Sequence, residues 1–185
     1  MKGLLFNLLE GFVCAASDLD TYEEILAACP LRTRRPFVGP LTYPDEDLVA
    51  LVAASSARLG LSPEELLVAL GRHCFPRLAA RIPHVVQGQT HVKTFLLGLD
   101  EIVHTAARQR FKDARPPRIT VREVSPDELL LRYESARGLC ALARGLVEGA
   151  GEHFHTPLRA SEIRCVASGA DACELRITFQ QAAAE

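Results

Sequence analysis

Residues 118–135 read RITVREVSPDELLLRYES, and this stretch decides the architecture. Two runs rich in β-branched residues and leucine, 118–124 and 128–135, flank the turn sequence Ser125-Pro126-Asp127. Two such runs joined by a short polar connection with proline are typical of a β-hairpin. We therefore expect antiparallel strands in the middle of this chain.

The end of this stretch carries three polar side chains in the pattern Tyr133-x-Ser135-x-Arg137. Alternate residues of a strand share one face, so Tyr133 and Ser135 should point the same way, with Arg137 close behind. Two hydroxyls and one guanidinium can together bind a pair of carboxylates through charge-assisted hydrogen bonds. A strand end that is merely solvated would show the same pattern, so this triplet needs a second feature beside it.

The remaining chain predicts an α+β fold with a helical N-terminal half. Apolar residues recur at helical spacing near the N-terminus, Asp20-Thr21 can cap a short second helix, and Ser62-Pro63-Glu64-Glu65 is a typical helix start. After the first hairpin the pattern predicts a helix and a second hairpin, which completes one antiparallel sheet. The expected helices are 45–59, 63–75 with an end at Pro76, 90–111 and 136–155, and the expected strands of the second hairpin are 160–167 and 172–179.

Composition and charge set limits on the class of protein. A chain of 185 residues is most simply one domain, which we place at 1–180, with a short alanine-rich tail at 181–185. The formal net charge of −2 gives no reason to expect nucleic acid or a membrane surface as a partner. No apolar run approaches the roughly 20 residues that span a bilayer. Six cysteines without an export signal predict reduced thiols in a cytoplasmic protein.

The order of motifs along the chain resembles the H-NOX family, the haem nitric oxide/oxygen binding domains. In that family the Tyr-x-Ser-x-Arg element binds the haem propionates, and a histidine upstream of it binds the iron. The resemblance implies a haem b buried within the α+β fold, held by Tyr133, Ser135 and Arg137. The matching segments are MKGLLFNLLE at 1–10, TYPDE at 42–46, Phe75-Pro76, His104, Pro116-Pro117, YESARGLC at 133–140 and GADAC at 169–173.

Helical periodicity does not by itself select His104 as an iron ligand. The cleanest apolar stripe of its segment runs through Leu96, Leu99 and Ile102, and His104 lies beside that stripe. The resemblance selects it, because it stands in the family's ligand context ahead of Pro116-Pro117. Pro117 matches the proline that presses on the haem in the family, although a simple turn proline would look the same.

The resemblance also bears on which gas is bound. Oxygen-binding members carry a tyrosine on the helix after the propionate-binding element, and the matching position here is Leu142, with Leu146 one turn further along. Together with Leu5 and Leu9 these residues predict an apolar distal pocket. We therefore expect nitric oxide binding and exclusion of oxygen. His73 is the residue most able to change that outcome.

Three of the cysteines match a second site of the family. Some members hold zinc with three cysteines and one histidine, and Cys140, Cys165 and Cys173 match the three thiolates. The histidine position is taken by Glu162, and carboxylates are rarer than imidazoles in structural zinc sites. Buried free thiols or a disulfide are the open alternatives. The other donors considered for the fourth position are His153 and His155.

Two classes of function follow from these observations. The first is a gas sensor that signals in trans, because no kinase, cyclase or methyl-acceptor segment stands in these 185 residues. The family implies a separate histidine kinase or cyclic-di-GMP enzyme as its partner. The second is a zinc or thiol redox module in which haem is minor. An enzyme is not expected, since the apolar pocket lacks an acid–base pair.

Overall fold

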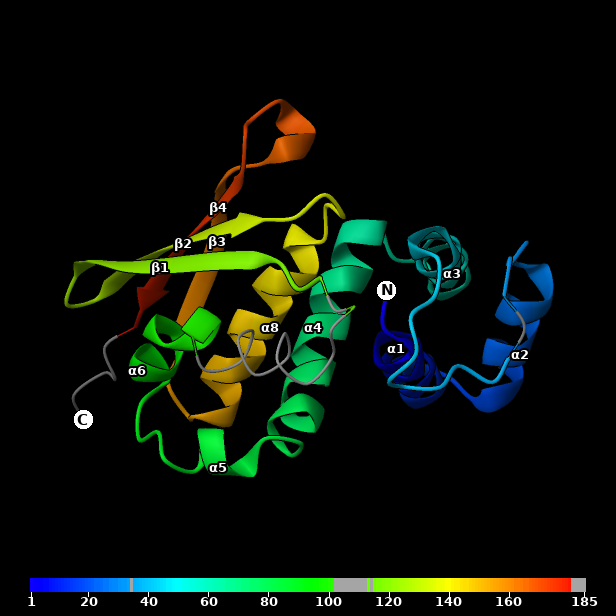
Figure 1. The fold of residues 1–185 in the computed structure, drawn as a ribbon, viewed down its shortest axis with the longest axis horizontal. Coiled ribbons are helices and arrows are strands. Elements are labelled where there is room, and N and C mark those ends of the chain that lie inside the picture. Colours follow the sequence, from blue (N-terminus) through cyan, green and yellow to red (C-terminus); the bar gives the residue numbers. More distant parts are fainter. Residues whose placement is uncertain (34, 102–112, 114, 181–185) are drawn as a thin grey trace. The chain divides into compact units, whose positions relative to one another are not determined.

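Four antiparallel strands form one sheet in the computed structural model of this chain, in the order β1-β2-β4-β3. The first hairpin is β1 (Arg118–Ser125) with β2 (Glu128–Glu134), and the second is β3 (Leu158–Arg164) with β4 (Cys173–Phe179). The central pair, β2 and β4, joins the two hairpins. Both predicted hairpins are thereby confirmed, as is the α+β class (Figure 1).

The structure describes residues 1–33, 35–101, 113 and 115–180. Their contacts divide the chain into two compact units, Met1–Leu70 and Gly71–Glu185, and each is described by itself. The division falls inside α4 (Pro63–Ala79). That the chain forms a single domain over 1–180 stays a prediction.

The first unit is helical. It contains α1 (Gly3–Ala16), α2 (Leu19–Ala28) and α3 (Asp45–Leu59), whose apolar faces pack on one another. The bounds of α3 are as the sequence predicts, and Gly60 ends this helix with a left-handed φ of 68°. The cap of α2 differs from the expectation, because Asp18 rather than Asp20 accepts the hydrogen bond from the Thr21 amide. The largest fully buried side chains of the unit include Phe6, Leu9, Val13, Tyr22 and Leu51.

The second unit places its helices against one face of the sheet. Here α6 (Val92–Leu97) packs on β1, and α8 (Cys140–His153) packs on β3 (Figure 1). The short α5 (Pro83–Val86) precedes them along the chain. Alternate residues of β2 point into this core, which also takes in Phe95, Val147 and Ile177.

Several predicted helix bounds differ from the structure. In place of the helix expected over 90–111, α6 begins at Val92 and ends at Leu97 with Gly98 as its C-cap, and residues 102–112 lie outside the described part of the chain. The helix expected to stop at Pro76 continues to Ala79. A proline inside a helix removes one backbone hydrogen bond and can bend the helix without ending it, and the ring of Pro76 is exposed. The helix expected from residue 136 begins only at Cys140. Gly138 has a φ of 63°, and an α-helix cannot pass through a left-handed residue. Residues 135–139 therefore form a separate turn between β2 and α8.

The second part of α4 approaches α8 so closely that only glycine fits at the contact. A Cβ on Gly71 would lie 2.5 Å from the Leu142 carbonyl oxygen and 2.6 Å from the Leu146 amide nitrogen. A Cβ on Gly149 would lie 3.0 Å from the Arg72 Cα. These atoms belong to the backbone and cannot turn away as a flexible side chain would.

Among the described residues, no helix has both the length and the apolar character needed to cross a bilayer.

We predict that Gly71→Ala destabilises the protein. Overpacking of a helix contact costs about 1–3 kcal/mol, and the better helix propensity of alanine offsets at most about 1 kcal/mol of this. The free energy of unfolding, measured by urea denaturation, should fall. Gly88→Ala is the matched control, since its added Cβ would meet only the His84 carbonyl oxygen at 3.8 Å. A Gly71→Ala protein as stable as the parent would contradict the close contact.

Candidate functional site

Tyr133 lies next to the C-terminal end of β2. Its side chain is 5% exposed and shares the inner face of the strand with Leu129 and Leu131. Across the sheet it stands opposite Ile119 on β1 and opposite Cys173 on β4. Because neighbours on both sides hold the strand, the phenol is fixed against the core.

Ser135 and Arg137 lie in the turn that follows β2. The Ser135 Oγ accepts a hydrogen bond from the Arg137 amide at 3.2 Å, and the Ser135 side chain also hydrogen-bonds the Tyr133 phenol. The structure thus brings together all three residues that the sequence singles out. We call them the polar triad.

The Arg137 guanidinium reaches back to the segment before β1, where Nη1 donates a hydrogen bond to the Arg115 carbonyl oxygen. Arg115 is followed by Pro116 and by the half-buried Pro117. Sequence analysis did not find this contact, because the two residues stand 22 positions apart and the acceptor is a backbone atom. One side chain therefore links the polar triad to the Pro117 segment.

The electrostatics of the triad suit an anionic ligand. Burial raises the pKa of Tyr133, and the hydrogen bond from Ser135 opposes that rise. The phenol is therefore neutral at physiological pH and keeps a proton to donate. A guanidinium carries a permanent positive charge and five N–H donors, and one of these binds the Arg115 carbonyl oxygen. The donors present fit the two propionates of a haem.

The other residues of the predicted haem site are less fully defined. His104 lies outside the described residues, so its role as iron ligand stays a prediction. In the second unit Leu142 is buried on α8 and Leu146 packs against the core. In the first unit Leu9 is fully buried and Leu5 is half-buried on α1. The role of these four leucines in a distal pocket stays a prediction.

Three cysteine sulfurs of the second unit gather in one buried cluster. The Sγ atom of Cys165 lies 3.5 Å from that of Cys140 and 3.5 Å from that of Cys173. Disulfide sulfurs would be about 2.0 Å apart. Thiolates around a tetrahedral zinc, with Zn–S near 2.3 Å, lie about 3.8 Å from one another. The spacing therefore fits a shared metal ion better than a disulfide. We call these residues the thiol cluster.

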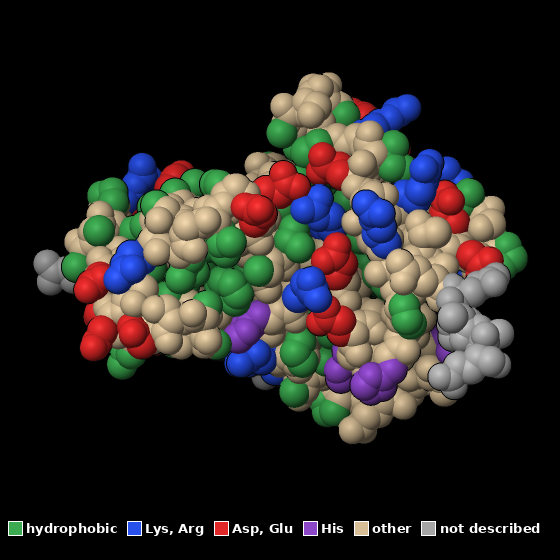
Figure 2. All heavy atoms as spheres, turned by 180° about the vertical axis from the view of Figure 1, so that it is seen from behind, with side chains coloured by type: hydrophobic (Ala, Val, Ile, Leu, Met, Phe, Trp, Pro, Cys, Tyr) green, Lys and Arg blue, Asp and Glu red, His purple; other side chains and the backbone are tan. Residues whose placement is uncertain are grey.

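No fourth ligand joins the thiol cluster among the described residues. Glu162 is exposed on the edge strand β3, where the pairing with β4 shifts between Glu162 and Arg164, so the structure does not bring it to the sulfurs. His153 and His155 are also exposed and stand outside the cluster. Exposed histidines are visible on the surface of Figure 2. Water is then the natural fourth ligand for a metal held here.

The thiols of Cys140 and Cys165 are protonated when no cation is bound. Burial, followed by hydrogen bonds with the neighbouring sulfurs, raises the pKa of Cys140. Burial also raises the pKa of Cys165. A metal ion must displace these protons, so its affinity should increase with pH.

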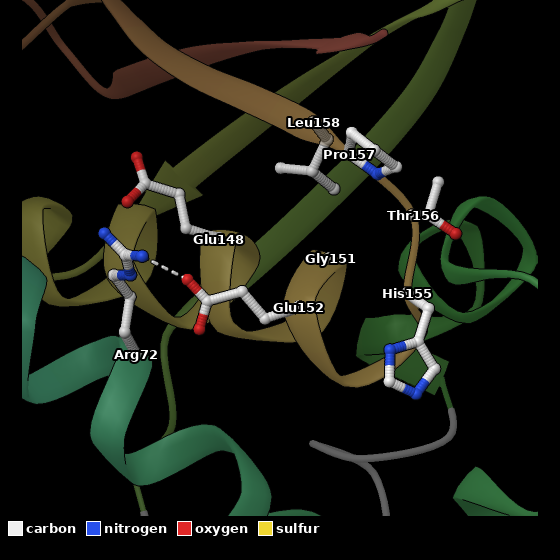
Figure 3. A pocket seen from close by; sticks show the side chains of 8 residues that line it. All are labelled: Arg72, Glu148, Gly151, Glu152, His155, Thr156, Pro157 and Leu158. Carbon is white, nitrogen blue, oxygen red and sulfur yellow. Dashed lines mark hydrogen bonds and ion pairs between the residues drawn. The ribbon is translucent and has the colours of Figure 1, made fainter. Parts of the chain in front are cut away.

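A charged cleft of about 400 Å³ opens elsewhere on the second unit (Figure 3). Arg72 of α4 forms an ion pair with Glu152 of α8, and Glu148 and His155 line the same cleft. Sequence analysis missed it, because Arg72 and Glu152 stand 80 positions apart. Its charged and open walls do not suit a haem, which needs enclosing apolar side chains.

The family of the chain follows from comparison with known proteins. A family model described as haem-NO-binding matches residues 2–162. The chain belongs to this family. H-NOX domains are haem-binding gas sensors rather than enzymes, so the predicted family and class of cofactor are confirmed.

Solved H-NOX structures share the fold. The crystal structure of an H-NOX protein from S. oneidensis in the Fe(II)NO state is 29% identical, covers 98% of this chain and 100% of that chain, and has a TM-score of 0.90. The NMR structure of the Shewanella oneidensis H-NOX domain in the Fe(II)CO state is also 29% identical. It covers 98% of this chain and 100% of that chain, with a TM-score of 0.89. The crystal structure of the unliganded Fe(II) H-NOX protein from K. algicida is 20% identical, covers 100% of both chains and has a TM-score of 0.88. At this identity the likeness supports the shared fold and nothing further. Comparison with curated protein sequences gave no significant match.

We predict that the thiol cluster binds one zinc ion per chain. Elemental analysis of protein purified without chelator should find zinc in the parent and lose it in Cys173→Ser, because two thiolates hold zinc far less well than three. Cys74→Ser is the control, since Cys74 is buried outside the cluster. Zinc retained in Cys173→Ser, or absent from the parent, would contradict the assignment.

Proposed function

We propose that this H-NOX protein senses nitric oxide through a haem held by His104 and by the polar triad, and that it signals to a separate protein. The observation that carries the proposal is the convergence of Tyr133, Ser135 and Arg137 at the C-terminal end of β2. Three donors prepared for anionic ligands there suit the propionates of haem b.

The triad residues divide the binding of haem among them. Tyr133 donates a hydrogen bond from a fixed, buried position, and Ser135 orients that phenol. Arg137 adds a permanent positive charge. Through its hydrogen bond to Arg115, Arg137 also holds the segment of Pro117, which the family likeness places against the porphyrin.

His104 would supply the single neutral imidazole that fixes the iron. A ferrous haem bound through one histidine offers an open coordination position for a diatomic gas. The S. oneidensis structures in Fe(II)NO and Fe(II)CO states, which resemble this chain at 29% identity, support gas binding here.

The side chains proposed for the distal pocket favour nitric oxide over oxygen. Bound oxygen gains strongly from a nearby hydrogen-bond donor, whereas nitric oxide needs little such help. Leu142 and Leu146 have no donor. Burial, followed by the charge of Arg77, lowers the pKa of His73, so this imidazole is neutral at physiological pH. His73 remains the side chain most able to alter the preference.

Signal transfer would begin with a change in the bond between His104 and the haem. Release of His104 would free its segment of the chain, which then presents a different surface to a partner protein. A histidine kinase or a cyclic-di-GMP enzyme is the partner that the family suggests. We place the protein in the cytoplasm, as one non-enzymatic domain over residues 1–180.

A second candidate function rests on the thiol cluster. Three buried sulfurs within 4.8 Å of one another would respond to zinc or to oxidants without any haem. A zinc or thiol redox module of this kind would lack a Soret band, whereas its partner would still respond to oxidants.

We predict that the reduced native protein discriminates between the two gases. Absorption spectra should show a Soret band that shifts with nitric oxide, and no persistent oxygenated spectrum after mixing with air, because the proposed pocket is apolar. A stable oxygenated spectrum would refute the gas preference. The absence of any Soret band would instead favour the thiol module.

We predict that His104→Gly loses gas-dependent haem spectra and regains them when imidazole is added to the buffer. The small side chain leaves room for the free ligand, which can replace the missing one. His84→Gly, at an exposed position of the second unit, is the control and should keep the native spectra. Native spectra in His104→Gly without imidazole would show that another residue binds the iron.

A further inference from the structure

The thiol cluster and the polar triad are direct neighbours in the sheet. Tyr133 of β2 and Cys173 of β4 stand opposite each other in an antiparallel pair, and both side chains are buried. Directly opposed residues on one face of such a pair have Cβ atoms about 4.5–5.5 Å apart. The phenol of the triad therefore packs beside one sulfur of the cluster.

The two groups are also joined along the chain by the turn of residues 135–139. This turn leaves β2 just after Tyr133 and enters α8 at Cys140. Inside it, the Gly138 amide donates to the Ser135 carbonyl oxygen at 3.5 Å, and the Cys140 thiol donates to the Gly138 carbonyl oxygen at 4.0 Å. Ser135 and Arg137 thus lie on a turn whose far end is a residue of the thiol cluster.

Cys165 lies between the two cysteines that flank this turn, Cys140 at the start of α8 and Cys173 opposite Tyr133. It belongs to the second hairpin, and its sulfur lies 3.5 Å from both Cys140 and Cys173. Protonated thiols are weak hydrogen-bond partners, so without metal the start of α8 is held loosely to that hairpin. A zinc ion bound to three thiolates would replace these weak contacts with strong bonds.

We propose that metal occupancy of the thiol cluster sets how tightly the protein retains haem, because the cluster anchors the turn that carries Ser135 and Arg137. The inference rests on the proposed function, in which the triad holds the propionates. Recognition of a carboxylate by a guanidinium depends on the position and angle of both groups. A turn that has lost one anchor holds Arg137 less precisely, so haem escapes faster.

The test measures haem transfer from the full-length protein to excess apomyoglobin. Removal of zinc with a chelator should increase the rate of haem loss about tenfold, which corresponds to a loss of about 1.4 kcal/mol of binding free energy. Zinc chloride added back should restore the slow rate. Cys165→Ala should lose haem quickly with or without zinc. Cys74→Ala, which changes a buried thiol of the same unit outside the cluster, should behave as the parent.

A second measurement needs no haem. In the haem-free protein, zinc should slow amide hydrogen exchange at Gly138 and Leu139 in the parent and in Cys74→Ala, but not in Cys165→Ala. If zinc leaves hydrogen exchange at these amides unchanged, the inference is overturned, even in a protein that takes up no haem. Failure to take up haem would by itself refute the proposed function. Equal haem loss with and without zinc, or failure to bind zinc, would overturn the inference and leave the nitric oxide spectrum as separate support for sensing.

Discussion

The burial of Tyr133 between two neighbouring strands is the constraint on which the site depends. A phenol in the core needs a hydrogen-bond partner, and the side chain of Ser135, two residues later, provides it. That bond fixes the first residue of the turn after β2. Since Arg137 binds Ser135 through its amide, its guanidinium also starts from a defined place. The anion-binding group is therefore an extension of the sheet rather than a flexible loop.

The same constraint links the site to two distant segments. Arg137 holds the carbonyl of Arg115, and the chain between this point and β1 contains Pro117. On the neighbouring strand β4, Cys173 stands opposite Tyr133, and the Cys165 sulfur lies close to those of Cys173 and Cys140. The polar triad and the thiol cluster thus lie side by side in the second unit, joined by the turn between β2 and α8.

Local sequence predicted the elements whose determinants are also local. The Ser62-Pro63-Glu64-Glu65 start of α4 forms reciprocal hydrogen bonds between Ser62 and Glu65, and the two hairpins follow their alternating patterns. Predictions were wrong where one residue could be read in two ways. Pro76 reads as a helix end but lies inside the last turns of α4, and residues 136–139 read as helix although Gly138 is left-handed. Backbone conformation at glycine and proline depends on what surrounds them.

The sequence by itself determined the strand pattern, the Tyr-x-Ser-x-Arg spacing and the family likeness, because residue type and period act over a few positions. Only the tertiary structure decided which distant groups meet. It brings Arg137 to the Arg115 carbonyl, gathers three cysteines from α8 and the second hairpin, and turns Glu162 outward on an edge strand. Strand register and helix packing determine these contacts. Register and packing are in turn set by burial of the whole core rather than by any short stretch of chain.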